Sequence, residues 1–323
     1  MPLLTRDAKG VYPISITPFH DDGAIDLAGM DRLVDFFLQC GVPGITVLGV
    51  LGEANKLSEE EGLGLLGHAL RRVNGRAQVI AGAGHVGFDN LERFAGRAME
   101  AGAAGLMIAP APGLKTEEQV FAYFDALTRR IGEATPVALQ DYPQHTGVFL
   151  SAGTLGALIE RHPGIKVVKH EESSALRKIS RLRAQEAEGR RGRVSILVGN
   201  SGIHLPQELH RGADGANTGV AFPEMLVEVC RRFSVGEAAA GEDLYDLFLP
   251  LVRHEQQPGI GLAIRKEIFR RRGLIASARV RAPGPALDAD DHAELGLLLD
   301  RLDRKLRDAG EAGVIEAYPV AAE

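Results

Sequence analysis

The sequence alternates short apolar runs with helix-like segments eight times in its first two-thirds. Each run ends near a glycine, a proline or a polar turn, as the strands of a buried parallel sheet do. The runs are residues 12–18, 44–49, 78–82, 105–110, 136–140, 164–169, 194–199 and 214–219. Eight strand-then-helix units predict a closed parallel (β/α)8 barrel, the TIM-barrel fold, since a doubly wound sheet normally has fewer strands.

Capping signals mark several of the helices between these strands. Ser58 with Glu61, and Thr116 with Gln119, match the capping-box pattern, and Pro223 suits the first turn of a helix. We expect helices at residues 26–40, 58–73, 89–101, 116–131, 151–161 and 173–188, one ending near 211, and one beginning at 223.

The strand signals stop after about residue 233. Segments 237–253, 260–272 and 288–308 have helical patterns, and we expect the ending 318–323 to be loose. The sequence therefore predicts a (β/α)8 barrel with the active site over residues 1–233 and a C-terminal helical region over 234–323. We expect these last helices to pack beside the barrel and to leave its catalytic mouth open.

Composition excludes several functional classes. The 37 Lys and Arg against 43 Asp and Glu give a net charge of −6, which argues against nucleic-acid or anionic-membrane partners. No apolar run is long enough for a signal peptide or a membrane span. The two cysteines, Cys40 and Cys230, form neither a metal pattern nor a disulfide framework. We therefore expect a reduced, cytoplasmic protein.

One lysine stands out among the residues at the strand ends, where barrels of this kind carry their chemistry. Lys169 is the last residue of the run 164–169 and the only lysine at such a position. Strand alternation puts Ile165 and Val167 on the face of Lys169. Apolar surroundings favour the neutral amine, which can attack a carbonyl carbon. A solvated lysine is the simpler interpretation of this stretch alone, but the barrel context favours an amine nucleophile.

Two other patterns carry less weight. Residues 82–87 spell G-x-G-x-x-G, but no acidic residue closes the next strand, so we interpret them as a tight turn and expect no nucleotide cofactor. Residues 170–172, His-Glu-Glu, alternate in direction, and His204 and His210 do not share a helix face. We expect solvated or locally hydrogen-bonded side chains at all of these positions, and no metal site.

With these residues assembled, the chain resembles the dihydrodipicolinate synthase / N-acetylneuraminate lyase family of class I aldolases. The opening at 10–19 looks like the family's start. Val168-Lys169-His170-Glu171 falls on the I-K-[ED] segment of the Schiff-base lysine, and 212–216 on the segment before the eighth strand. The resemblance implies pyruvate or another 2-keto acid bound as an imine on Lys169, without metal or organic cofactor, in a homotetramer.

The same resemblance shows departures around the pocket. Gly49-Val50-Leu51-Gly52-Glu53 falls where the family has G-[ST]-[ST]-G-E, so Val50 and Leu51 replace the hydroxyl pair that holds the keto-acid carboxylate. Their backbone N–H groups can still bind a carboxylate. The family's acid–base tyrosine is Gln140 here, and Tyr142, two residues on, can replace it or only pack.

Further departures affect the second half of the pocket. The segment Gln140-Asp141-Tyr142-Pro143-Gln144-His145-Thr146-Gly147 falls on the family's Y-N-x-P-x-R-T-G, so His145 replaces the arginine that binds a second carboxylate in the synthases. Pro112 takes the place of the tyrosine after strand four that a neighbouring subunit often supplies. These differences argue against lysine biosynthesis and against sialic acid cleavage. Gly199 and Asn217, at the ends of their strands, are further candidate substrate contacts.

We therefore predict a Schiff-base lyase, aldolase or dehydratase that acts on a 2-keto acid such as pyruvate or its adducts. Lys169 is the predicted nucleophile, with Tyr142, Gln140 and His145 near the reacting atoms. The alternative is a catalytically inactive paralogue that serves as a keto-acid-binding or regulatory protein. A nicotinamide-dependent oxidoreductase, suggested by the glycine-rich turn, is a third hypothesis.

Overall fold

Eight parallel strands form the centre of the molecule in a computed structural model that describes residues 2–173 and 176–316. They are β1 (Gly10–Pro13), β2 (Gly44–Val47), β3 (Gln78–Gly82), β4 (Gly105–Ile108), β5 (Val137–Asp141), β6 (Ile165–His170), β7 (Ser195–Val198) and β8 (Gly215–Thr218). Each strand pairs with its neighbours in the order β1-β8-β7-β6-β5-β4-β3-β2. A parallel bridge between Ile14 and Thr46 and a hydrogen bond from the Ser15 N–H to the Thr46 carbonyl (2.8 Å) join β1 to β2. The predicted barrel is confirmed.

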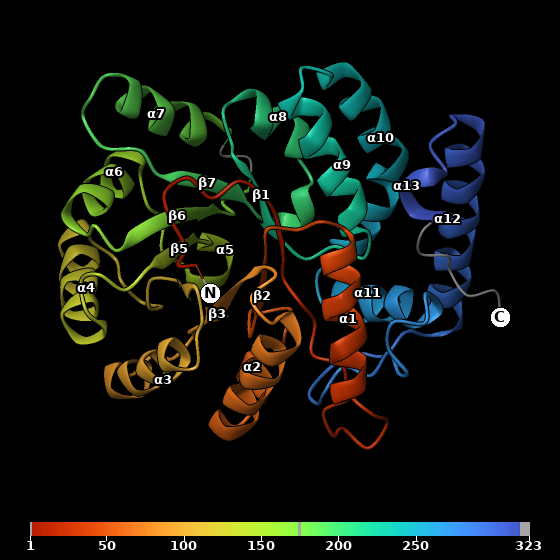
Figure 1. The fold of residues 1–323 in the computed structure, drawn as a ribbon, viewed down its shortest axis with the longest axis horizontal. Helices are drawn as coiled ribbons and strands as arrows, with labels where there is room; N and C mark the ends of the chain where they lie inside the picture. The colour runs from red at the N-terminus through yellow and green to blue at the C-terminus, as the bar shows by residue number, and fades with distance from the viewer. Residues whose placement is uncertain (1, 174–175, 317–323) are drawn as a thin grey trace.

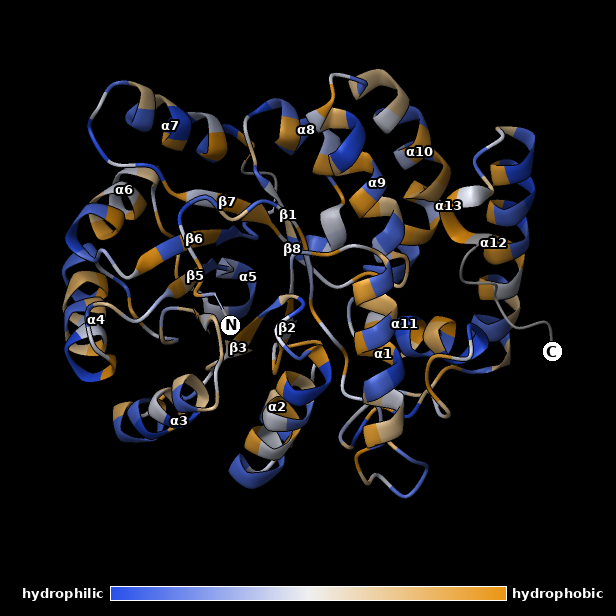
Figure 2. Ribbon diagram, in the orientation of Figure 1, coloured by the Kyte–Doolittle hydropathy of each residue, from blue (hydrophilic) through white to orange (hydrophobic). Residues whose placement is uncertain are grey.

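A ring of helices surrounds the barrel, and the apolar side of each helix faces the strands (Figures 1 and 2). The helices are α1 (Leu27–Gln39), α2 (Glu59–Val73), α3 (Phe88–Glu100), α4 (Glu117–Ile131), α6 (Ala152–Arg161), α7 (Leu176–Ala187), α8 (Leu205–His210) and α9 (Pro223–Ser234). The capping boxes of Ser58 and Thr116 are confirmed, and Pro223 is the first residue of α9. The short α5 (Pro143–Thr146), after β5, is too brief to show a helical period and was not expected.

Apolar side chains fill the barrel interior. They come from the strands and from the N-terminal segment, which lies near the middle of the ring in Figure 1. The interior cluster is Leu4, Ala8, Tyr12, Ile14, Ile80, Met107, Ala138, Val167 and Leu197. The Leu4 N–H donates to the Ala104 carbonyl (2.8 Å), which holds the segment across the N-terminal ends of the strands. That end of the barrel is closed, so a site open to substrate has to lie at the C-terminal ends.

Strand β6 contains an irregularity that changes the predicted faces. Ile165 pairs with Val137, but the next pair along the ladder is Val167 with Ala138, so Lys166 is an extra residue. Ile165 consequently packs in the outer layer, whereas Val167 belongs to the barrel interior. The expectation that Ile165 shares the face of Lys169 is wrong, because the bulge interrupts the two-residue alternation.

Up to residue 316, four helices follow the barrel: α10 (Ala238–Glu255), α11 (Gly261–Arg271), α12 (Ala289–Asp308) and α13 (Gly313–Glu316). Figure 1 shows them to one side, next to α9 and α1. Helix α11 nevertheless reaches the rim, since the buried Lys266 ammonium donates to the Thr17 carbonyl (2.9 Å) and to Glu53 Oε1 (2.5 Å). The expected loose ending, 318–323, lies outside the described residues. Within the described chain, no helix is both long and apolar enough to cross a membrane.

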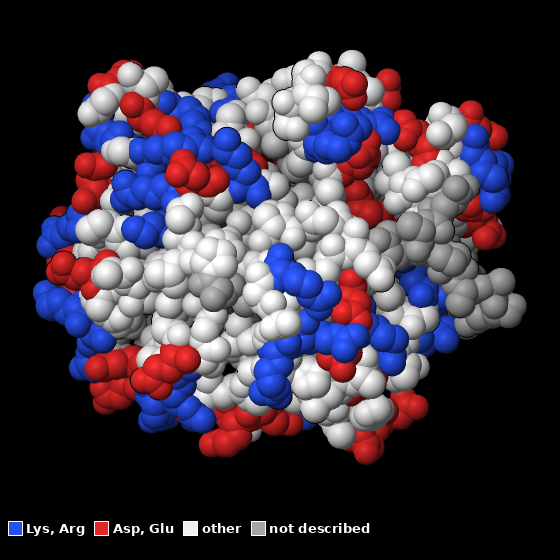
Figure 3. Space-filling model, in the orientation of Figure 1, with Lys and Arg blue, Asp and Glu red and all other residues white. Residues whose placement is uncertain are grey.

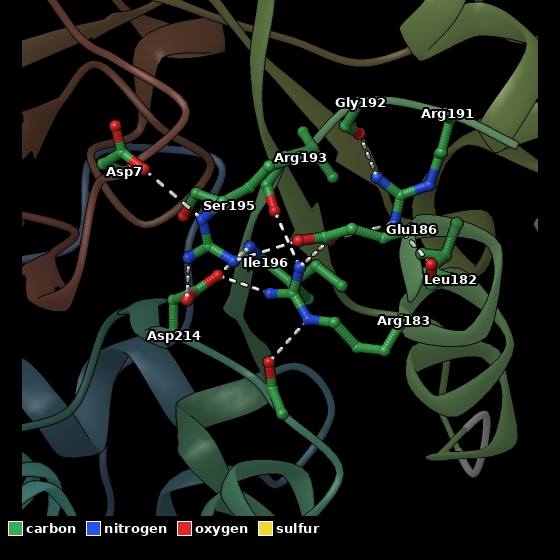
Figure 4. Close-up of polar contacts among 12 residues, drawn as sticks. Asp7, Leu182, Arg183, Glu186, Arg191, Gly192, Arg193, Ser195, Ile196 and Asp214 are labelled. Carbon is green, nitrogen blue, oxygen red and sulfur yellow. Dashed lines mark hydrogen bonds and ion pairs between the residues drawn. The ribbon is translucent and has the colours of Figure 1, made fainter. Parts of the chain in front are cut away.

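Charged side chains of both signs gather over α7 and the neighbouring loops (Figure 3). Asp214, just before β8, is at the centre of one cluster (Figure 4). Its carboxylate accepts hydrogen bonds from the Ile196 N–H (2.9 Å) and from the guanidinium groups of Arg183 and Arg193 (2.5 Å each). Asp214 therefore ties α7 and the segment before β7 to the start of β8, at the end of the barrel opposite the candidate site.

We expect Asp214→Ala to lower the free energy of unfolding by about 2–3 kcal/mol, because it leaves two arginines and an amide without their common acceptor. Urea denaturation followed by circular dichroism measures the change. Asp303→Ala is the matched control, since Asp303 pairs with Arg307 on the surface and its loss should cost about 0.5 kcal/mol or less. Equal effects of the two substitutions would contradict the prediction.

Candidate functional site

A cavity of about 450 Å³ opens at the C-terminal ends of β2 to β5. The turn after β2 and the loops after β3 and β4 form its walls, and Gln140 and His145 contribute from β5 and α5. All of its lining residues fall between Leu48 and Thr146, so the C-terminal helices contribute none of the described lining. The mouth of the barrel is thus open on this side, as the sequence predicts.

Lys169 lies one residue before the end of β6, and its neighbour on β5, Gln140, lines this cavity. Lys169 is only 3% exposed, and its Nζ lies 3.0 Å from Glu171 Oε2. Gln140 is the register partner of Lys169 on β5, and its amide nitrogen donates to the same Glu171 oxygen (2.5 Å). Because Gln140 also lines the cavity, the three side chains form a continuous polar group between the barrel interior and the open space.

Glu171 is the functional candidate that sequence reasoning missed. We expected a solvated or locally bonded side chain, but the structure buries Glu171 to 7% exposure. The space it occupies exists because residue 199 is glycine: a Cβ there would lie 2.0 Å from Glu171 Cγ. Two signals in the sequence are consistent with this arrangement, namely the two-residue spacing from Lys169 to Glu171 and the glycine that ends the next strand.

His170 points to the opposite side of β6 and is also buried, contrary to expectation. Its Nδ1 lies 3.3 Å from Asp141 Oδ2, which also accepts a hydrogen bond from Lys178 Nζ of α7 (2.7 Å). Strand alternation places this pair in the layer between the barrel and α7, where partners replace water. Among the described residues no three His, Cys, Asp or Glu side chains gather as a metal site would require.

Tyr142 lies between β5 and α5, as the residue that precedes the helix, with its ring stacked on that of His145 at a centroid distance of 5.7 Å. Burial raises the pKa of the Tyr142 phenol, the charge of Glu171 raises it further, and the guanidinium of Arg265 lowers it. The phenol therefore lies within electrostatic reach of both the Glu171 carboxylate and a cation of α11. This position is compatible with proton transfer, which stays a prediction for Tyr142.

The two residues that replace the hydroxyl pair of related sequences point in different directions. Val50 is half exposed and lines the cavity, whereas Leu51 packs against the barrel interior. Leu51 takes the space above Gly219, where a Cβ would come within 2.0 Å of its Cδ1. An apolar side chain consequently covers the β8 side of the mouth, and the open space is confined to the β2–β5 side.

The remaining two candidate contacts have other partners in the structure. The Asn217 amide nitrogen donates to Thr46 Oγ1 (3.2 Å) inside the barrel, below the mouth. Gly199 gives space to Glu171, and its N–H donates to the His170 carbonyl (2.9 Å). Substrate contact by either residue stays a prediction.

We expect Gly199→Ala to lower kcat about 100-fold or more, because the new methyl group competes with the Glu171 side chain for one space. Steady-state kinetics on a 2-keto acid substrate and circular dichroism separate lost activity from lost folding. Gly96→Ala, in α3, is the control, since a Cβ there meets nothing within 4 Å. Full activity of Gly199→Ala would show that the position of Glu171 is unimportant.

The sequence matches those of known proteins over nearly its whole length. A family model for the dihydrodipicolinate synthetase family matches residues 7–302. The chain is 32% identical over 302 residues to L-2-keto-3-deoxyarabonate dehydratase of Azospirillum brasilense, covering 91% of this chain and 94% of that protein. It is 31% identical over 248 residues to 4-hydroxy-tetrahydrodipicolinate synthase of Methanocaldococcus jannaschii, covering 76% and 82%.

Solved structures of proteins from the same family have the same fold as this chain. A dihydrodipicolinate synthase from Rhodopseudomonas palustris has a TM-score of 0.91 and 42% identity, covering 93% of this chain and all of its own. A prophage protein of the dihydrodipicolinic acid synthase family from E. coli K12, solved in complex with pyruvate, has a TM-score of 0.84 and 26% identity, covering 91% of this chain and 98% of its own. The chain described here belongs to the dihydrodipicolinate synthetase family.

Proposed function

We propose that this protein is a dehydratase that removes water from a 2-keto-3-deoxy sugar acid through an imine on Lys169. The observation that carries the proposal is the contact between the buried Lys169 amine and the Glu171 carboxylate (3.0 Å). A relative named L-2-keto-3-deoxyarabonate dehydratase, which is similar over nine-tenths of the chain, supports the reaction type. Lyases and dehydratases are the enzyme types among its relatives.

Imine formation needs a neutral amine and a place for its protons. Glu171 can accept a proton from Lys169, since the two groups are in hydrogen-bond contact. The free amine then adds to the C2 carbonyl of the keto acid to give a carbinolamine. The carbinolamine oxygen leaves as water with the proton that Glu171 took from Lys169, which restores the Glu171 carboxylate. The product is an iminium ion in which C2 is bonded to the Lys169 nitrogen.

Lys169 and Glu171 can also eliminate water from the bound substrate. Glu171 removes a proton from C3, and the C–H electrons move to the iminium nitrogen to give an enamine. The enamine electrons then form the C3–C4 double bond as the C4–O bond breaks, and the departing hydroxide takes the proton that Glu171 removed from C3 and leaves as water. Hydrolysis of the imine releases the unsaturated keto acid and restores the Lys169 amine, so the net change is the loss of one water.

The cavity favours a substrate with an uncharged tail. Its lining, as far as the structure describes it, contains neither lysine nor arginine, so a second carboxylate or a phosphate would meet no cationic side chain there. Asn55, Ser58, His85 and His145 offer donors and acceptors for hydroxyl groups instead. A keto acid of five or six carbons that ends in hydroxyl groups suits these side chains.

Borohydride reduction tests the covalent step. With pyruvate or a 2-keto-3-deoxypentonate, we expect a reduced adduct on the peptide that contains Lys169, detected by peptide mass mapping, and none in Lys169→Ala. Glu171→Gln should still be labelled at equilibrium, because burial favours the neutral Lys169 amine once the carboxylate is gone. It should lose water-elimination activity by about 10²–10⁴-fold. Glu172→Gln is the matched control, because Glu172 pairs with Lys178 on the other side and should retain activity. A folded protein that no keto acid labels would favour the binding or regulatory paralogue.

Substrate comparison tests the proposed tail. We expect kcat/KM for a 2-keto-3-deoxy acid that ends in a hydroxyl group to exceed that for an analogue that ends in a carboxylate by about 10-fold or more, because the second charge finds no partner. We also expect Gln140→Tyr not to condense pyruvate with aspartate semialdehyde, since His145 stands where the synthases have the arginine that binds the second carboxylate. Coupled absorbance assays measure both. Efficient condensation by that single variant would contradict the proposed substrate class.

A further inference from the structure

The turn after β7 has an unusual backbone. Asn200 and Ser201 both adopt left-handed conformations, with φ of 49° and 55°, and Gly202 follows at 68°. Residues with a Cβ avoid this region, so two in succession persist only where surrounding contacts hold them. Such backbone strain is concentrated at functional sites, and this turn lies directly beside Glu171.

One side of the turn holds the strand end that carries Glu171. The Asn200 side-chain amide donates to the Glu171 backbone carbonyl (2.7 Å), and the Asn200 N–H lies 3.5 Å from Glu171 Oε1. Gly199, one residue earlier, provides the space for the Glu171 side chain. The conformation of the turn therefore determines where the carboxylate can lie.

The other side of the turn is held from the C-terminal helical region. Arg265 of α11 donates from Nη2 to Ser201 Oγ (2.5 Å), and that hydroxyl donates in turn to the Gly219 carbonyl (3.0 Å). Arg265 is only 5% exposed and also pairs through Nε with the buried Glu255 (3.1 Å). Glu255 accepts a hydrogen bond from the Ala221 N–H (3.1 Å), which attaches the pair to the loop after β8.

We infer that Arg265 is a positioning residue for the Glu171 carboxylate and acts through Ser201 and the left-handed turn. The inference rests on the proposed function, in which Glu171 moves the C3 proton. Arg265 already has a buried counter-ion in Glu255, so its bond to Ser201 is not needed to neutralise its charge. The Arg265 guanidinium also lowers the pKa of the Tyr142 phenol, in keeping with its place beside the candidate site.

Proton exchange on a bound keto acid separates positioning from general stability. In D2O, the imine of pyruvate should exchange its C3 protons through the Glu171 carboxylate, and proton NMR follows the loss of the methyl signal. Dividing this rate by the amount of imine trapped with borohydride gives proton transfer per imine. A variant that merely loosens the fold lowers the amount of imine and the exchange rate together. A displaced carboxylate lowers the exchange rate and leaves the amount of imine trapped at equilibrium unchanged.

We expect Arg265→Lys and Ser201→Gly to keep the trapped imine near the wild-type amount and to lower exchange per imine by about 10–100-fold. Glycine is tolerated at the φ of Ser201, so Ser201→Gly removes the hydroxyl without adding strain and decides the question if Arg265→Lys does not fold. Arg271→Lys, on the same helix but paired with Glu267, is the matched control and should behave as wild type.

A double variant sharpens the test. If Arg265 acts through Glu171, Arg265→Lys should have no further effect in a Glu171→Gln background, because the group it positions has already lost its function. Equal effects of Arg265→Lys in the wild-type and Glu171→Gln backgrounds would overturn the inference. Unchanged exchange per imine in both Arg265→Lys and Ser201→Gly would also overturn it, as would a loss of imine that matches the loss of exchange. Absence of any imine or exchange in the wild type would instead refute the proposed function.

Discussion

The candidate chemistry of this protein depends on an amine and a carboxylate that share a buried position. Lys169 and Glu171 lie 3.0 Å apart and are almost fully shielded from water. Removing two charges from water is costly unless further hydrogen bonds support them. Gln140 and Asn200 give Glu171 those bonds, and the result is a proton acceptor already in contact with the amine that must lose its proton.

The barrel makes this arrangement possible because parallel strands of matched register bring their ends together. Lys169 and Gln140 are register partners on neighbouring strands, and Glu171 follows two residues beyond the lysine. The bulge at Lys166 sets which β6 residues face inward. At the opposite end of the barrel the interior is filled with apolar side chains, so the polar group at the mouth rests on a rigid base.

The C-terminal helices contribute to the site without lining its cavity. Helix α11 reaches the rim at two places, through Lys266 on Glu53 and through Arg265 on Ser201. Glu53 ends the turn that presents Val50 to the cavity, and its carboxylate also accepts hydrogen bonds from Lys56 Nζ and the Arg281 N–H (2.9 Å each). Buried ion pairs of this kind lose much when one partner is removed, which makes the helices and the barrel rim interdependent.

By itself, the sequence determined the elements whose signals are local. The strand at 78–82, the capping boxes at Ser58 and Thr116, and the lysine at the end of its strand all follow from neighbouring residues. The tertiary structure decided what depends on distant partners. Glu171 is buried because Gly199, on the next strand, has no side chain, and Ile165 faces outward because pairing with β5 introduces a bulge. Arg265 reaches the site from 64 residues beyond Ser201, a contact for which no local pattern exists because only the packing of α11 against the barrel creates it.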